Sequence, residues 1–134
     1  MTTRFDAIVV GTGQAGPALA ARLSGAGMKV AVIERDKFGG TCVNDGCTPT
    51  KTMVASAYAA RLAQRSAEYG VTGGGKPTVD MKRVKARKDQ VVANSSGGVE
   101  KWMRGLKGGA VYQGHARFLD KSGVQIGDRA EPAQ

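Results

Sequence analysis

The sequence predicts an α/β fold built on a parallel sheet, and three observations near its N-terminus carry this prediction. Residues 5–10, Phe-Asp-Ala-Ile-Val-Val, read as a strand of the largely apolar type that is buried on both faces in parallel sheets. The run leads directly into Gly11-Thr-Gly13-Gln-Ala-Gly16, a G-x-G-x-x-G pattern. A helical segment, a second apolar run and an acidic residue, Glu34, then follow in that order. Together they predict a complete βαβ unit of the Rossmann-like, nucleotide-binding type.

Each glycine of this pattern has its own predicted role in holding a dinucleotide. Gly11 allows a tight turn, and Gly13 lets the backbone approach a pyrophosphate. Gly16 lets the helix predicted over residues 17–26 pack close to the first strand. We therefore expect the pyrophosphate at the N-terminus of that helix.

Glu34 closes the second predicted strand, which covers residues 28–33. A carboxylate at this position accepts hydrogen bonds from the ribose hydroxyls of an adenosine and repels a 2′-phosphate. The sequence therefore favours an unphosphorylated ribose, as in FAD or NAD, over NADP. The alternative is a solvated acid at the end of a strand.

Both cysteines of the chain, Cys42 and Cys47, lie within residues 39–51. A helix is predicted to begin between Cys47 and Pro49, because proline is tolerated in a first helical turn. Cys47 then lies at a helix N-terminus, where the helix dipole and Lys51 favour a thiolate over a thiol.

The run Gly-Gly-Thr-Cys-Val-Asn-x-Gly-Cys-x-Pro-x-Lys at residues 39–51 resembles the redox segment of the flavin-dependent pyridine nucleotide-disulfide oxidoreductases. Glutathione reductase, dihydrolipoamide dehydrogenase and mercuric reductase belong to that family. The resemblance implies that Cys42 and Cys47 form a redox-active disulfide, in which Cys42 meets the substrate and Cys47 exchanges electrons with the flavin. It also implies that Lys51 lies against the isoalloxazine ring. The alternative is a structural disulfide, or two buried free thiols in an ordinary domain.

If these two cysteines pair, the backbone between them must depart from an ideal helix. Residues five positions apart on a helix are separated by roughly 7.5 Å along its axis. A disulfide requires Cα separations of about 4.4 to 6.8 Å. Asn44, Asp45 and Gly46 permit tight or left-handed backbone, so we expect a bend there.

The same resemblance implies a three-layer FAD-binding domain that takes electrons from NAD(P)H. The residues that it implies in contacts with FAD are Gly11, Gly13, Gly16, Glu34, Gly40, Thr41, Lys51, Gly114, His115 and Ala116. The last three form a shorter match, at a point where the family's backbone borders the adenine. His115 is the sole histidine, and without a partner visible in the sequence it is interpreted as packing or backbone geometry rather than a general base. No metal site is predicted.

The rest of the chain reads as a connector, a long helix and three strands. Residues 70–76 nearly match the phosphate loop G-x-x-x-x-G-K-[ST], but Pro77 lacks the hydroxyl that a magnesium ion requires, so a flexible connector is predicted. Asp80 is expected to cap a helix reaching Gly105, in which two adjacent glycines at 97 and 98 make a kink or a break possible. Short strands are predicted over residues 110–113, 115–119 and 123–127.

Twenty Lys and Arg against 11 Asp and Glu give a net charge of +9, which suits anionic ligands, nucleic acid or a membrane surface. A basic cluster opens the long helix, at Lys82, Arg83, Lys85, Arg87 and Lys88. It is interpreted as a solvated face, because nucleic-acid binding would call for aromatic residues among the charges. No stretch approaches 18 apolar residues and no signal peptide is recognised. We therefore expect a cytoplasmic protein with neither a nucleic-acid nor a membrane partner.

The resemblance covers residues 4–127, but only the first portion of the family's protein. It predicts a partial FAD-binding domain over residues 1–127 and a loop-like tail over residues 128–134, with the nicotinamide-binding and dimerisation domains absent. The full-length family is expected to be homodimeric. An open sheet cut short is expected to leave unpaired edges and exposed apolar surface.

The predicted function is the FAD-binding, redox-disulfide portion of an oxidoreductase, inactive as an isolated chain. Electrons are expected to pass from NAD(P)H through FAD and the cysteine pair to a disulfide or metal-ion acceptor. The run at residues 48–57 looks most like mercuric reductase-type members. A different class stays open: a stand-alone nucleotide-binding or redox-sensing module without catalysis.

Overall fold

The structure, a computed structural model, describes residues 3–127. Its elements, in chain order, are β1 (Ala7–Val10), α1 (Gly16–Gly25), β2 (Val30–Glu34), α2 (Gly40–Asn44), α3 (Cys47–Gln64), the 3₁₀ helix η1 (Ser66–Tyr69), α4 (Met81–Arg104), β3 (Gly109–Gln113), β4 (His115–Phe118) and β5 (Val124–Gly127). The predicted helices and strands are all present, and most of their boundaries are shifted by no more than two residues. The predicted tail, residues 128–134, lies outside the described residues.

Three parallel strands form the sheet that organises the molecule, in the order β1-β2-β3. Strand β2 is central: Val30 pairs with Ala7 on one side and with Gly109 on the other. The predicted α/β class and the βαβ unit of β1, α1 and β2 are therefore confirmed. A separate antiparallel hairpin, β4 and β5, follows the sheet.

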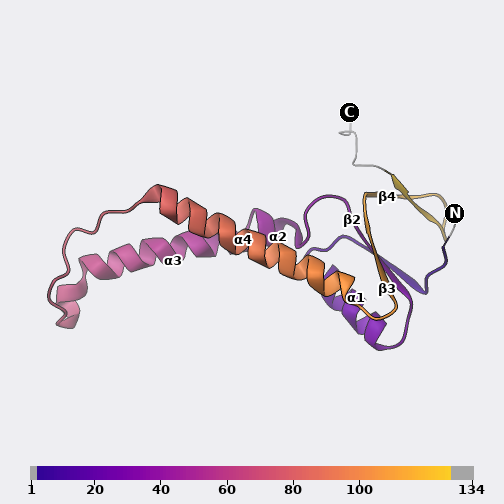
Figure 1. Ribbon diagram of the computed structural model, residues 1–134, viewed down its shortest axis with the longest axis horizontal. Coiled ribbons are helices and arrows are strands. Elements are labelled where there is room, and N and C mark those ends of the chain that lie inside the picture. The colour runs from indigo at the N-terminus through magenta and orange to yellow at the C-terminus, as the bar shows by residue number, and fades with distance from the viewer. Residues whose placement is uncertain (1–2, 128–134) are drawn as a thin grey trace.

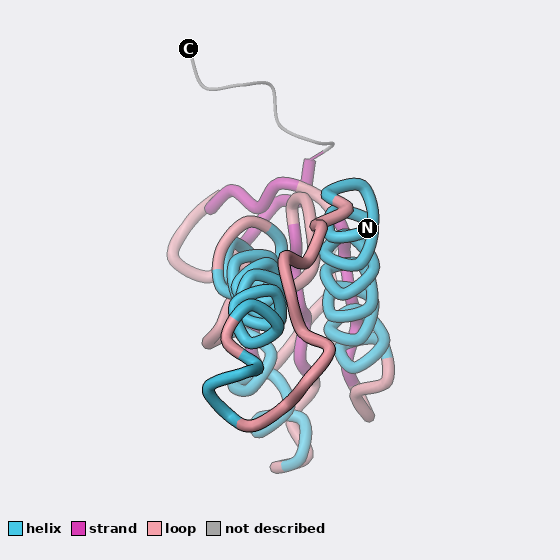
Figure 2. The backbone as a smooth tube through the Cα atoms, turned by 90° about the vertical axis from the view of Figure 1, so that its left-hand side faces the viewer, coloured by secondary structure: helices cyan, strands magenta, loops and turns pink. Residues whose placement is uncertain are grey.

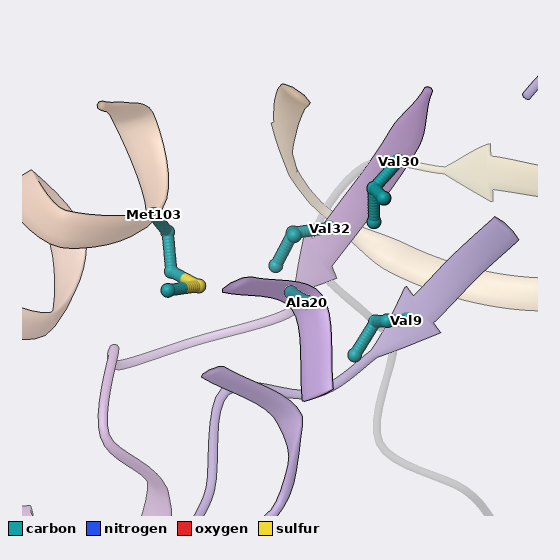
Figure 3. Close-up of a cluster of buried hydrophobic side chains, with 5 residues drawn as sticks. All are labelled: Val9, Ala20, Val30, Val32 and Met103. Atoms are coloured by element: carbon teal, nitrogen blue, oxygen red, sulfur yellow. The ribbon is translucent and has the colours of Figure 1, made fainter. Parts of the chain in front are cut away.

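The hydrophobic core lies between this sheet and two helices. Val30 and Val32 alternate along β2 and point to the same face. There they pack with Val9 of β1, Ala20 of α1 and Met103 of α4, as Figure 3 shows. Because α1 and α4 share this cluster, they cover the same face of the sheet.

The prediction that the first strand is buried on both faces is wrong for β1. Val9 is 7% exposed, but its neighbours Ile8 and Val10 are 41% and 58% exposed. The reason is the position of β1 at the edge of the sheet, where the helices cover the face that Val9 occupies. Only the central strand β2 is buried at all of its positions. The expected exposed apolar surface and unpaired strand edge are thus found at β1.

The crossover from β2 to β3 carries a long two-helix arm. Helices α3 and α4 lie side by side and extend away from the sheet (Figure 1). The view along the arm shows residues 71–80 joining the far ends of its helices (Figure 2). Asp80 caps α4 as predicted, since its Oδ1 accepts hydrogen bonds from the backbone N–H groups of Lys82 and Arg83 at 3.0 and 3.1 Å.

The helix does not break at residues 97 and 98, because α4 runs without interruption from Met81 to Arg104. Two glycines in a helix interior disfavour it by roughly 1 kcal/mol each relative to alanine. Tertiary contacts on either side of them offset this: Ser96 bonds to the Phe38 carbonyl and Met103 is buried. Packing has overridden local propensity here.

Part of the basic cluster is neutralised or used within the arm. Lys85 and Lys88 both pair with Asp89, and these lysines hold the pKa of the Asp89 carboxyl below its ordinary value. The Arg87 guanidinium donates a hydrogen bond to the Thr52 carbonyl of α3 at 2.9 Å.

Within residues 3–127, no helix has the length and apolarity to cross a membrane.

Candidate functional site

The turn after β1 brings its glycines into close contact. Gly11 has φ of +92°, a backbone conformation that favours glycine. A Cβ on Gly16 would lie 2.1 Å from the Gly11 carbonyl oxygen, so only glycine lets α1 pack this close to the turn. A Cβ on Gly13 would meet no atom within 4 Å. The backbone at Gly13 therefore borders open space beside the start of α1.

The N-terminus of α1 points its first backbone N–H groups toward this turn. Its N-cap residue, Ala15, makes no side-chain capping hydrogen bond, and Pro17 stands in the first turn. The first N–H groups of a helix lack partners inside the helix, and together with the helix dipole they attract anions. The turn and the helix start thus have the features of a phosphate-binding site.

Glu34 ends β2 and turns its carboxylate inward. It is 7% exposed, and its Oε2 accepts hydrogen bonds from the Thr12 backbone N–H at 2.9 Å and the Thr12 hydroxyl at 2.6 Å. Its Oε1 accepts a third, from the Asp36 backbone N–H, at 3.0 Å. Glu34 is therefore buried and hydrogen-bonded to the turn after β1. This disfavours the alternative of a solvated acid at the strand end.

These hydrogen bonds keep Glu34 ionised. Burial acts to raise the pKa of the Glu34 carboxyl, but the donors from Thr12 and Asp36 outweigh burial and hold the pKa below its ordinary value of 4.5. Oε2 accepts two hydrogen bonds and Oε1 accepts one, and the Arg35 backbone N–H also lowers the pKa of this carboxyl. Oε1 is therefore the oxygen with more room for an added donor.

The redox segment begins against the nucleotide turn. Gly39 and Gly40 have φ of +95° and +60°. A Cβ on Gly40 would lie 2.9 Å from the Cα of Gly13. The Gly39 N–H donates a hydrogen bond to the Thr12 hydroxyl at 3.1 Å. Two contacts therefore join the turn after β1 to the segment that holds the cysteines.

Cys42 and Cys47 form a disulfide with a Cα separation of 4.7 Å. Cys42 is on the short helix α2 and Cys47 is the first residue of α3, so the predicted bend lies between them. Gly46 makes the bend, with φ of −119° and ψ of −107° rather than a left-handed conformation. The alternative of two free thiols is excluded, because neither cysteine is free.

The two cysteines differ in surroundings. Cys47 is exposed and Cys42 is half-buried. Lys51 stands four residues after Cys47 on the 18-residue helix α3, so the two lie on the same helical face, and Lys51 is exposed. Once reduced, a thiol at this helix start has both the dipole and a nearby ammonium to favour its thiolate. Thr41, on α2, is likewise exposed.

The carbonyl of Phe38 anchors the redox segment. It accepts hydrogen bonds from the Asn44 side-chain amide at 3.0 Å and from the Ser96 hydroxyl of α4 at 2.8 Å. The Asn44 amide also donates to the Gly40 carbonyl at 2.9 Å. Helix α2 is thereby tied both to its own loop and to the arm.

The Gly114-His115-Ala116 run lies next to Glu34. The Gly114 N–H donates to the Glu34 carbonyl at 2.9 Å, and a Cβ on Gly114 would lie 2.5 Å from the Gly127 carbonyl oxygen. His115 pairs with Gly127 across the β4–β5 hairpin and Ala116 with Ile126. The His115 Nδ1 is buried and has no hydrogen-bond partner among residues 3–127.

Contacts thus connect part of the predicted site around the carboxyl ends of β1 and β2, namely Gly11, Gly13, Gly16, Glu34, Gly40 and Gly114. Lys51 follows on α3, and Ala116 lies on the β4–β5 hairpin. Sequence reasoning missed Thr12, which is fully buried at the centre of that region, and also Phe38 and Ser96. A hydroxyl residue inside the glycine pattern was an available signal for Thr12. The described residues contain no group of His, Cys, Asp or Glu that could hold a metal ion.

Comparison with known proteins gives consistent matches along nearly the whole chain. A family model described as pyridine nucleotide-disulphide oxidoreductase matches residues 5–131. A dihydrolipoyl dehydrogenase of Bacillus subtilis is 37% identical over 123 residues, which cover 91% of this chain and 25% of that protein. One of Haloferax volcanii is 34% identical over 131 residues, which cover 98% of this chain and 27% of that protein.

Solved structures of flavoprotein disulfide reductases also match this chain. The HOCl-induced flavoprotein disulfide reductase RclA of Escherichia coli superposes with a TM-score of 0.73 at 30% identity, over 90% of this chain and 24% of that one. A Cu(II) complex of RclA matches equally well. The chain therefore spans about a quarter of the length of these relatives.

Proposed function

Because the chain belongs to the pyridine nucleotide-disulphide oxidoreductase family, we propose that it is the FAD-binding and redox-disulfide portion of a flavoprotein oxidoreductase. The observation that carries the proposal is the packing of Gly40 against Gly13. It places the segment that bears the Cys42–Cys47 disulfide directly against the turn suited to a dinucleotide. A disulfide with a purely structural role would not require the turn after β1 to lie beside it.

The residues present fit FAD. The open space at Gly13 and the uncapped start of α1 suit a pyrophosphate. The Oε1 atom of the ionised Glu34 suits a ribose hydroxyl and disfavours a 2′-phosphate. The backbone at Gly114 to Ala116, beside Glu34, would border the adenine. Thr41 and Lys51 would lie toward the isoalloxazine ring.

When bound, FAD supplies a two-electron relay between a nicotinamide hydride and the disulfide. The chain's own part is to present that disulfide. Cys47, which is exposed at the start of α3, would be the sulfur that receives electrons, and Cys42 would then be released as the thiol that attacks the acceptor. Overall, NAD(P)H, a proton and an acceptor disulfide give NAD(P)⁺ and two thiols, and the Cys42–Cys47 disulfide is restored.

We propose a small-molecule disulfide as the acceptor, because the relatives named above include dihydrolipoyl dehydrogenases and a flavoprotein disulfide reductase. A metal ion is the second candidate. It is favoured by the mercuric reductase-like run at residues 48–57 and by the Cu(II) complex of RclA. The two are separated by whether the reduced cysteine pair is reoxidised by lipoamide or binds Hg²⁺ or Cu²⁺.

We further infer that this chain alone does not turn over. It carries a single G-x-G-x-x-G pattern and it spans about a quarter of its relatives' length. Within these 134 residues, NAD(P)H therefore has no second turn of this type to bind. Steady NAD(P)H oxidation by the chain with FAD, above the rate of free FAD, would contradict this inference.

The FAD site is tested by a pair of matched substitutions. Gly13→Ala adds a methyl group where the folded chain has open space, and Gly25→Ala does the same at the far end of α1. Both variants are expected to fold as the wild type does. Flavin that remains bound through gel filtration is expected in the wild type and in Gly25→Ala, but is lost in Gly13→Ala, whose methyl group occupies the pyrophosphate's place.

If the wild type retains a nucleotide but no flavin, the stand-alone nucleotide-binding module is favoured instead. If Gly13→Ala retains FAD as well as the wild type does, the pyrophosphate does not bind at this turn. Full-length proteins of this kind are proposed to be homodimers that act in the cytoplasm.

A further inference from the structure

Thr12 makes three hydrogen bonds in the site, although the sequence predicted no role for it. It is fully buried within the glycine pattern. Its hydroxyl donates to Glu34 Oε2 at 2.6 Å and at the same time accepts the Gly39 N–H at 3.1 Å. Its own backbone N–H donates to the same Oε2 at 2.9 Å. One side chain thus joins β1, the end of β2 and the start of the redox segment.

These contacts determine how Glu34 can meet a ligand. Each carboxylate oxygen has about two acceptor positions. Both positions of Oε2 are filled by Thr12, whereas Oε1 accepts the Asp36 N–H, and the backbone N–H of Arg35 also acts on the carboxylate. A ligand hydroxyl can therefore reach Glu34 through Oε1, and Thr12 decides which oxygen that is.

We propose that Thr12 is a positioning residue for nucleotide binding: its hydroxyl orients the Glu34 carboxylate toward the ribose and fixes Gly39 at the entry to the redox segment. The inference rests on the proposed function, because it assumes that FAD occupies the site. Thr12 itself need not touch the nucleotide. It acts through Glu34, and this distinguishes it from the glycines around it.

Removal of the hydroxyl has a defined consequence. In Thr12→Val the backbone N–H still bonds to Oε2, but one acceptor position of Oε2 is left empty and the Gly39 N–H loses its acceptor. The carboxylate is then free to turn, and a buried donor is unsatisfied. Thr12→Ser keeps the hydroxyl and loses only a methyl group, so it is the matched control.

The test is a double-mutant cycle on FAD affinity, measured by flavin fluorescence with the full chain. Hydrogen bonds to charged groups are strong enough for Thr12→Val to weaken FAD binding about 10- to 100-fold. Thr12→Ser is expected to stay within about threefold of the wild type, since the hydroxyl is kept. In a Glu34→Gln background, adding Thr12→Val is expected to change the affinity by less than about threefold, because its effect passes through Glu34.

A second readout needs no flavin. The pKa of the Glu34 carboxyl, followed by carbon-13 NMR in the chain without FAD, is expected to rise in Thr12→Val and to stay as in the wild type in Thr12→Ser. A residue that only fills space would not move it. If the valine variant does not fold, Thr12→Ala removes the same hydroxyl without the added methyl group, and the same comparisons apply.

The outcomes separate the two claims. If the wild type binds FAD and Thr12→Val binds it equally well, the positioning role is overturned and the proposed function stands. Equal losses from Thr12→Val in the wild-type and Glu34→Gln backgrounds also overturn it, since Thr12 would then act independently of Glu34. If the wild type binds no FAD, the proposed function fails, and the positioning of Glu34 for FAD fails with it.

Discussion

The hydroxyl of Ser96 donates a hydrogen bond of 2.8 Å to the carbonyl of Phe38, 58 positions earlier in the chain. This contact joins α4 to the loop that starts the redox segment. The same carbonyl accepts the Asn44 amide, which holds α2. The arm is therefore a support for the disulfide, in addition to being a connection from β2 to β3.

Ser96→Ala is expected to destabilise the chain by about 1 kcal/mol, because one acceptor position of a partly buried carbonyl loses its donor. Ser95→Ala is the matched control. The Ser95 hydroxyl bonds only to the Val91 carbonyl of its own helix, so its removal should change the free energy of unfolding by less than about 0.5 kcal/mol. Urea denaturation measures both. Equal effects would show that the Ser96 contact does not support the fold.

The two helical glycines Gly16 and Gly97 respond in opposite directions to the same change. A methyl group at Gly16 would lie 2.1 Å from a backbone oxygen, whereas at Gly97 it would meet nothing within 4 Å. Gly16→Ala is therefore expected to cost more than about 2 kcal/mol. Gly97→Ala is expected to gain about 0.5 to 1 kcal/mol from helix propensity. Thermal unfolding of the two variants tests both expectations. Destabilisation by Gly97→Ala would contradict the expected gain from helix propensity.

Glu34 makes the stability of the chain depend on pH. The folded pKa of its carboxyl lies below the ordinary value of 4.5, so the hydrogen bonds contribute fully above about pH 4.5 and are lost as the pH falls through the folded pKa. Unfolding followed from pH 7 to pH 3 should show the wild type losing its advantage over Glu34→Gln in this acid range. Glu68→Gln is a control, because that side chain is 59% exposed. A difference between wild type and Glu34→Gln that is constant with pH would contradict the assignment.

The disulfide also stabilises the fold, although it closes a short loop. The chain-entropy model gives about 2 kcal/mol for a loop of this size. Denaturation with and without a dithiol reductant should differ by about that amount in the wild type. The double variant Cys42→Ser/Cys47→Ser should show no response to reductant. A reductant effect that persists in the double variant would have another origin.

The sequence was sufficient for the elements whose signals are local. The βαβ unit, the bend between Cys42 and Cys47 and the Asp80 cap depend on glycine, on spacing and on a capping side chain, all of which can be read along the chain. One prediction was wrong, and a break considered possible does not occur, because contacts between distant elements determine both features. The first strand lies at an edge of the sheet, and α4 continues through residues 97 and 98 because contacts on either side stabilise it.

The site was predicted in part for the same reason. The pattern glycines, Glu34 and the two cysteines could be proposed from the sequence because each has a recognisable spacing. Thr12 could not, since its importance depends on Glu34 and Gly39 meeting at one hydroxyl, which requires the fold. The roles of all these residues toward a flavin, and those of Lys51 and His115, stay predictions.

The central claim is that the flavin and the cysteine pair form one redox unit. It is tested most directly by the visible absorption spectrum of the chain with FAD, before and after a dithiol reductant, in the wild type, Cys42→Ser and Cys47→Ser. We expect a long-wavelength charge-transfer band on reduction that is kept in Cys42→Ser and lost in Cys47→Ser. Bound flavin whose spectrum is the same in both variants would contradict the claim.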